Sequence, residues 1–180
     1  MNTLRAFGDS YTDPLYTGPR GILNWASALQ GSGYTTRTEN YALGGARASF
    51  SQTISFDKQI GNWKRTGSGI AERDLTVTYF GYNDVGRNGR PADEWAASKA
   101  GYAEGLKQLT EAGAASGTNR IFVTQIHDWG RNPGVNPTRT RPMIVEWNQH
   151  VAALANANPN IIAVDLYTVF NRILDEPAKY

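Results

Sequence analysis

The sequence predicts a three-layer α/β/α fold in which a five-stranded parallel sheet lies between helices. Short runs rich in β-branched and aromatic residues alternate five times with segments whose apolar residues recur at helical spacing. Such alternation is typical of a parallel sheet whose right-handed crossover helices cover both faces. The chain has 180 residues, of which 40% are hydrophobic and 19% charged. These values are those of a globular protein, and we expect one domain spanning residues 1–180.

The predicted strands are apolar or β-prone runs bounded by glycine, proline or polar clusters. They are residues 4–7, 35–41, 75–80, 121–126 and 161–164. The run 75–80, Leu-Thr-Val-Thr-Tyr-Phe, is the clearest because β-branched and aromatic residues fill it. The five strands fit the flavodoxin-like order 2-1-3-4-5, which places the first three strands side by side.

The predicted helices carry apolar stripes at intervals of three and four residues. They are residues 22–29, 54–63, a long helix that begins at Pro91, a helix that begins at Pro142, and residues 166–174. Two segments are expected to be loops because proline, glycine and polar residues fill them. These loops are residues 13–21 and residues 127–141.

Composition excludes several function classes. The net charge is only +2, and the cluster of Arg131, Arg139 and Arg141 lacks interleaved aromatic residues, so we expect no nucleic-acid partner. The absence of cysteine excludes disulfides and thiolate chemistry. No apolar run approaches the roughly 20 residues of a transmembrane helix. Met1 leads directly into the first strand without the layout of a signal peptide, and the sequence indicates no particular compartment.

Three glycine-containing motifs follow the first three predicted strands. They are Gly8-Asp9-Ser10, the run from Asn40 to Gly45, and Gly81-Tyr82-Asn83-Asp84. The carboxyl ends of parallel strands meet at one edge of the sheet, where open α/β folds bind ligands. Each motif alone could equally be an ordinary turn, because glycine, aspartate, asparagine and serine all favour turns. We expect Asp9, Asp13 and Asp84 to be structural and to hydrogen-bond nearby backbone.

Together and in this order, the three motifs resemble the GDSL, or SGNH, family of serine esterases and lipases. The resemblance implies that Ser10 is the nucleophile. It also implies an oxyanion hole formed by the backbone N–H groups of Ser10 and Gly45 and the side-chain amide of Asn83. Gly45 is favoured over Gly44 because the family's glycine lies five positions after the asparagine of its motif, here Asn40.

The implied reaction is hydrolysis of a carboxylic ester through an acyl-Ser10 intermediate on an SGNH-type fold. The substrate class is a lipid, short-chain acyl or acetylated-sugar ester, and no metal or organic cofactor is implied. We expect Tyr11 and Tyr16, near the opening loop, to line an acyl or sugar pocket. The resemblance is compatible with a secreted or cell-surface protein.

The sequence departs from the family at the general base, which the family places in an Asp-x-x-His block after the last strand. No such block is present. His127 follows the fourth predicted strand and is more simply a loop histidine. His150 lies beside the apolar stripe of a helix and is more simply a partly packed surface residue. Neither is predicted to be the base.

Three explanations of this departure stay open. A further segment, on the same or another chain, supplies the aspartate and histidine. Alternatively, the chain is a catalytically incomplete relic that binds its ligand, or His127 has become the base. The first is favoured because the resemblance continues through residues 175–180. A flavodoxin-like nucleotide or flavin binder is a further rival, but no Gly-x-Gly-x-x-Gly or Gly-x-x-x-x-Gly-Lys loop follows any strand.

Overall fold

The computed structural model describes residues 1–50 and 52–179. Tyr180 therefore lies outside the described residues. It is the last residue of the predicted domain and of the stretch 175–180 in which the family resemblance continues. Five parallel strands form one sheet in the order β2-β1-β3-β4-β5. The strands are β1 (Thr3–Gly8), β2 (Arg37–Asn40), β3 (Leu75–Tyr79), β4 (Arg120–Thr124) and β5 (Ile161–Val164). The predicted fold class and strand order are confirmed.

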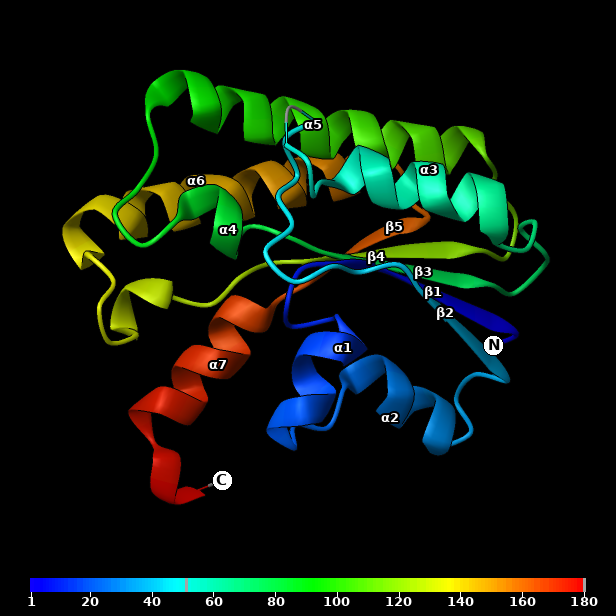
Figure 1. Ribbon diagram of the computed structural model, residues 1–180, viewed down its shortest axis with the longest axis horizontal. Helices are drawn as coiled ribbons and strands as arrows, with labels where there is room; N and C mark the ends of the chain where they lie inside the picture. Colours follow the sequence, from blue (N-terminus) through cyan, green and yellow to red (C-terminus); the bar gives the residue numbers. More distant parts are fainter. Residues whose placement is uncertain (51, 180) are drawn as a thin grey trace.

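Helices cover both faces of the sheet (Figure 1). One face carries α3 (Phe56–Thr66), α5 (Ala92–Glu111) and α6 (Pro137–Asn156). The opposite face carries α1 (Pro14–Thr17), α2 (Trp25–Gly31) and α7 (Leu166–Asp175). The remaining elements are α4 (Tyr82–Val85) and the 3₁₀ turns η1 (Gly18–Arg20), η2 (Trp129–Arg131) and η3 (Pro177–Lys179). No helix in the described part of the chain is long and apolar enough to cross a membrane.

The two faces of the sheet are packed unequally. A large core that includes Phe7, Phe56 and Trp147 joins the sheet to α3, α5 and α6. A small cluster joins it to α2, and its buried members are Leu4, Ala6, Ala26, Leu75 and Val77. No described residue of α7 is buried. The sheet face between α2 and α7 is therefore only thinly covered.

The main correction to the predicted elements concerns α6. This helix begins at Pro137, so the prediction of a loop up to residue 141 and a start at Pro142 was wrong. Asn136 explains the earlier start, because its side chain accepts the Arg139 N–H and its carbonyl oxygen accepts the Thr140 N–H. Proline is well suited to the first helical position, where its missing N–H costs nothing. Pro142 therefore lies inside the helix instead of starting it.

Side-chain caps also shift elements in the first half of the chain. The Asn24 side chain accepts the N–H groups of Ala26 and Ser27, so α2 begins at Trp25, three residues later than predicted. The predicted loop 13–21 contains α1 and η1, since Asp13 caps α1 by accepting the Leu15 N–H at 2.8 Å. The helix predicted at residues 54–63 is α3, shifted by two to three residues.

A buried arginine fixes the central strands. Arg5, in the middle of β1, is fully buried. Its guanidinium lies 2.7 Å from the Asp74 carboxylate and 3.4 Å from that of Glu39. Glu39 belongs to β2 and Asp74 immediately precedes β3. The ion pairs therefore connect β1 to the elements on both sides, and β1 is the strand that leads to Ser10.

Candidate active site

Ser10 lies in a tight turn at the carboxyl end of β1. The turn is closed by the N–H groups of Thr12 and Asp13, which both donate to the Asp9 carbonyl oxygen at 3.0 Å. The Asp9 carboxylate braces the same turn by accepting the Tyr11 N–H at 3.0 Å. Gly8 has a φ of +159°, and a Cβ there would lie 2.7 Å from the Tyr79 carbonyl oxygen. The turn therefore requires glycine directly before Asp9 and Ser10.

Three polar side chains hold this turn in place, and the sequence analysis named only one of them, Asn40, as a residue of the second motif. Gln59, on α3, accepts the Gly8 N–H at 2.9 Å and donates to the Gly8 carbonyl oxygen at 2.7 Å. Asn24 and Asn40 each donate to the Thr12 carbonyl oxygen at 2.8 Å. A signal for Gln59 exists in the sequence, because it lies on the same helical stripe as Phe56 and Ile60. A glutamine on an apolar stripe must find a buried partner.

The Gly44-Gly45 loop lies against this turn. A backbone bond from Ala46 N–H to Leu43 carbonyl closes the loop at 3.0 Å, with Gly45 at a φ of +82° that favours glycine. The Gly44 N–H donates to the Asp13 carboxylate at 2.8 Å. By contrast, the Gly45 N–H donates to no described residue. Of the two glycines, Gly45 therefore has the free donor.

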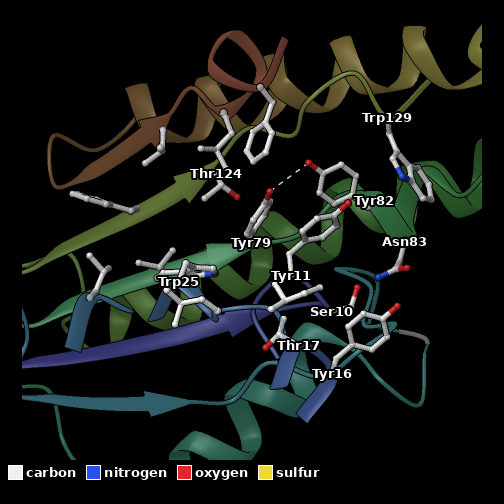
Figure 2. Close-up of a pocket in the computed structure, with 18 of the residues that line it drawn as sticks. Ser10, Tyr11, Tyr16, Thr17, Trp25, Tyr79, Tyr82, Asn83, Thr124 and Trp129 are labelled. Carbon is white, nitrogen blue, oxygen red and sulfur yellow. Dashed lines mark hydrogen bonds between the residues drawn. The ribbon is translucent and has the colours of Figure 1, made fainter. Parts of the chain in front are cut away.

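Asn83 is the second residue of α4, which only Phe80 and Gly81 separate from the end of β3. Its side-chain amide donates to the Ala46 carbonyl oxygen at 3.0 Å, which ties it to the Gly45 loop. One amide proton is used in this bond, and the second remains for another acceptor. Asn83 and Ser10 line the same pocket (Figure 2), whereas Gly45 lies outside the pocket lining. The structure thus brings the three sequence-predicted residues to one edge of the sheet.

Two buried aspartates lie beneath the site. Burial raises the pKa of Asp9 to about 7; the bond from the Tyr11 N–H opposes this shift and the charge of Asp84 adds to it. Burial also raises the pKa of Asp84, whose carboxylate accepts the Ala48 N–H at 2.9 Å. The Oδ2 atoms of both have no hydrogen-bond partner among the described residues. The predicted backbone bonds of Asp9, Asp13 and Asp84 are confirmed.

His127 is engaged by side chains other than Ser10. It is buried in the loop after β4, where its Nδ1 hydrogen-bonds to the Tyr82 hydroxyl and its ring stacks on Phe170 at 5.1 Å. Burial lowers its pKa. The Tyr11 ring packs on Tyr82 with centroids 4.7 Å apart. Within residues 1–50 and 52–179, no hydrogen bond joins Ser10 to His127.

His150 is the partly packed histidine that the sequence predicts. It is half-buried on α6, where its Nε2 lies 3.1 Å from the Lys99 carbonyl oxygen. Burial lowers its pKa. It does not hydrogen-bond to Ser10. Nor does the described part of the chain contain a cluster of three or more histidine, aspartate or glutamate side chains that could hold a metal ion.

The pocket beside Ser10 has a volume of about 930 Å³. Tyr11 and Tyr16 line it, as predicted, and the Arg20 guanidinium lies 3.7 Å from the centre of the Tyr16 ring. In Figure 2, Ser10, Tyr16 and Asn83 gather at one end of the pocket, and Trp25 lies toward the other. The site therefore combines a hydroxyl and an amide donor with an open, mostly apolar cavity.

Comparisons with solved structures support the fold. A member of the lipolytic G-D-S-L family from Veillonella parvula superposes with a TM-score of 0.57 at 17% identity, covering 97% of this chain and 83% of that one. An acetyl xylan esterase variant from Geobacillus stearothermophilus gives 0.60 at 18% identity, covering 96% and 80%. A carbohydrate acetylesterase from Sinorhizobium meliloti gives 0.56 at 14% identity, covering 92% and 84%. No curated protein sequence matches the chain.

The family assignment rests on the sequence itself. The model of the GDSL-like lipase/acylhydrolase family matches residues 6–180, which is nearly the whole chain. The match includes all three motifs that the structure gathers at the carboxyl edge of the sheet, and the solved structures share the fold. The chain belongs to the GDSL-like lipase/acylhydrolase family, and the class of reaction that this membership supports is ester hydrolysis.

Proposed function

We propose that this chain cleaves carboxylic esters through a covalent acyl-Ser10 intermediate. The observation that carries the proposal is the convergence of Ser10, the Gly45 loop and Asn83 at one edge of the sheet. The Asn83 side-chain amide donates a hydrogen bond to the Ala46 carbonyl oxygen, and the Gly44 N–H donates one to the Asp13 carboxylate. Asp13 belongs to the Ser10 turn. These contacts support the proposal, because acyl transfer needs a hydroxyl together with donors for the oxyanion, and the Gly45 N–H and the second amide proton of Asn83 have no hydrogen-bond partner among the described residues.

The proposed reaction uses these groups in two steps. The Ser10 Oγ attacks the acyl carbon while a base removes its proton, and the carbonyl oxygen becomes an oxyanion. The N–H groups of Ser10 and Gly45 and the second amide proton of Asn83 stabilise that charge. The alcohol leaves with a proton, and water then releases the acid from Ser10 by the same route. Lipid, short-chain acyl and acetylated-sugar esters all fit this chemistry.

The base in this proposal comes from outside residues 1–180, on the same or another polypeptide. His127 is engaged by Tyr82 and packed on Phe170. His150 bonds to the Lys99 carbonyl oxygen. Ser10 is half-buried and faces the open pocket, so a base can approach it from solvent. Free imidazole is therefore expected to substitute for the missing base, which a relic unable to form the acyl-enzyme would not show.

Replacing Asn83 with alanine tests the oxyanion hole. We expect imidazole-stimulated hydrolysis of p-nitrophenyl acetate to fall by about 10²–10³-fold, because losing one oxyanion donor typically costs that much. The measurement is the steady-state rate after subtraction of the rate with imidazole alone. Asn62→Ala, an exposed asparagine on α3, is the matched control and should retain the parent rate. A loss of less than threefold in Asn83→Ala would exclude Asn83 from the oxyanion hole.

A further inference from the structure

Asn83, the amide donor of the proposed oxyanion hole, lies on a helix that is too short to be stable alone. α4 has only four residues. The Val85 N–H closes it by donating to the Gly81 carbonyl oxygen at 2.8 Å. The Gly86 N–H donates to the Tyr82 carbonyl oxygen at 2.9 Å. Because the first turn of a helix is costly to form, contacts with other parts of the chain must fix the position of α4.

Two side chains of α4 bond to the chain that follows Gly45. The Asn83 amide donates to the Ala46 carbonyl oxygen at 3.0 Å, and the Asp84 carboxylate accepts the Ala48 N–H at 2.9 Å. These bonds leave the main-chain carbonyl oxygens of Asn83 and Asp84 free. In a helix of four residues, neither carbonyl has an N–H donor within the helix. The C-terminal end of α4 therefore needs a donor from elsewhere.

Arg90 supplies that donor. Its Nη2 donates to the Asn83 carbonyl oxygen at 2.8 Å and its Nε donates to the Asp84 carbonyl oxygen at 3.2 Å. The planar guanidinium fork suits two neighbouring acceptors, and its positive charge is favourable at a helix C-terminus. A Cβ on Gly86 would lie 3.0 Å from the Arg90 Cζ. Glycine at this position therefore leaves room for the guanidinium against the end of α4.

The position of Arg90 is itself fixed by α5. Arg90 directly precedes Pro91, the N-cap of α5, and a proline restricts the residue before it to extended conformations. α5 has 20 residues and packs in the large core through Tyr102, Leu106 and Leu109. In the described part of the chain Arg90 forms no ion pair, so no carboxylate competes for its guanidinium. One side chain thus connects a long packed helix to the short helix that carries Asn83.

We propose that Arg90 is a positioning residue for ester hydrolysis, because it holds the main chain of Asn83 and thereby keeps the side-chain amide in the pocket that Ser10 also lines. Asn83 is held at two points, since Arg90 bonds its carbonyl oxygen and Ala46 accepts one of its amide protons. These two contacts fix the direction of the second amide proton, and a preorganised donor is what stabilises an oxyanion. The inference rests on the proposed function for the role of Asn83.

Replacing Arg90 with methionine tests this role, because methionine keeps an apolar stem and has no N–H donor. We expect kcat for imidazole-stimulated hydrolysis of p-nitrophenyl acetate to fall about tenfold or more, since misplacing a catalytic group by about 1 Å can cost about 10²-fold. KM should stay within about twofold of the parent value, because the oxyanion exists only in the transition state. Arg139→Met, at an exposed arginine, is the matched control and should keep the parent kcat.

A double-mutant cycle separates positioning from a general loss of stability. In the Asn83→Ala background, Arg90→Met should change kcat by less than about twofold, because the amide through which Arg90 acts is absent. Equal losses in the two backgrounds would overturn the inference, since Arg90 would then act on another group or on the fold. A parent kcat in Arg90→Met, beside a loss of about 10²–10³-fold in Asn83→Ala, would refute the role of Arg90 and retain the proposed function.

The NMR resonance of the Asn83 side-chain amide reports its position without catalysis. The resonance is assigned by its absence from Asn83→Ala, and it should shift in Arg90→Met but not in Arg139→Met. An unchanged resonance in Arg90→Met would overturn the inference. A shifted resonance in a chain whose hydrolysis is unaffected by Ser10→Ala and Asn83→Ala would retain the positioning of Asn83 by Arg90 and refute the proposed function.

Discussion

Replacing Ser10 with alanine is expected to lower imidazole-stimulated ester hydrolysis by about 10³-fold or more, to the rate of imidazole alone. The variant cannot form the acyl-enzyme, so the base has no hydroxyl to activate. General bases contribute about 10²–10⁴-fold, and that contribution disappears together with the nucleophile. The measurement is p-nitrophenyl acetate hydrolysis by parent and variant across a series of imidazole concentrations.

A second serine controls for changes unrelated to the site. Ser27 is exposed on α2, and Ser27→Ala should keep both the parent rate and its dependence on imidazole. The loss in Ser10→Ala should occur without loss of thermal stability, because the Ser10 hydroxyl makes no hydrogen bond among the described residues. A Ser10→Ala variant that still responds to imidazole like the parent would rule out the acyl-Ser10 route.

Replacing Asp9 with asparagine is expected to stabilise the fold at pH 8 by about 4 kcal/mol and to have little effect at pH 3.5. The pKa of Asp9 is raised from 3.8 to about 7 in the folded protein. Between these values the unfolded carboxyl is ionised while the folded one keeps its proton. Stability therefore falls as pH rises through this window, and the loss is complete above about pH 7. Each unit of difference corresponds to about 1.4 kcal/mol.

Asparagine removes the charge and retains an oxygen that can accept the Tyr11 N–H. The free energy of unfolding should be measured by urea denaturation of both proteins at several values between pH 3.5 and 8. The difference between variant and parent should grow with pH and level off near pH 8. A difference that is constant with pH, or that decreases, would show that the Asp9 carboxyl is not held neutral by burial.

The fold could be predicted from the sequence because each strand and helix carries its own local signal. The β-branched run that forms β3 and the apolar stripe of α5 are such signals. The alternation of strand and helix signals along the chain then predicted a parallel sheet. The start of α6 was missed because it depends on the Asn136 cap, and Pro142 has the stronger local signature. The pocket beside Ser10 was also unpredictable, since it depends on how α2 and α7 are spaced over the sheet.

Of the candidate site, the sequence predicted the three motif residues but not the side chains that support them. Ser10, Gly45 and Asn83 stood in motifs, and parallel topology brought them to one edge. The supports came from elsewhere in the chain: Gln59 lies 51 positions from Gly8 in the sequence. The bond between Tyr82 and His127 spans 45 positions. Long-range bonds of single side chains leave no periodic pattern in a sequence, so they become visible only in the folded chain.

The central claim, that Ser10 is the nucleophile, is tested most directly by fluorophosphonate labelling followed by intact-mass measurement, with and without imidazole. The account predicts one adduct on the parent chain, formed faster as imidazole is added, and none on Ser10→Ala. The control His127→Ala should label as the parent does, because His127 is engaged by Tyr82. An adduct that persists in Ser10→Ala, or no adduct on the parent even with imidazole, would contradict the account.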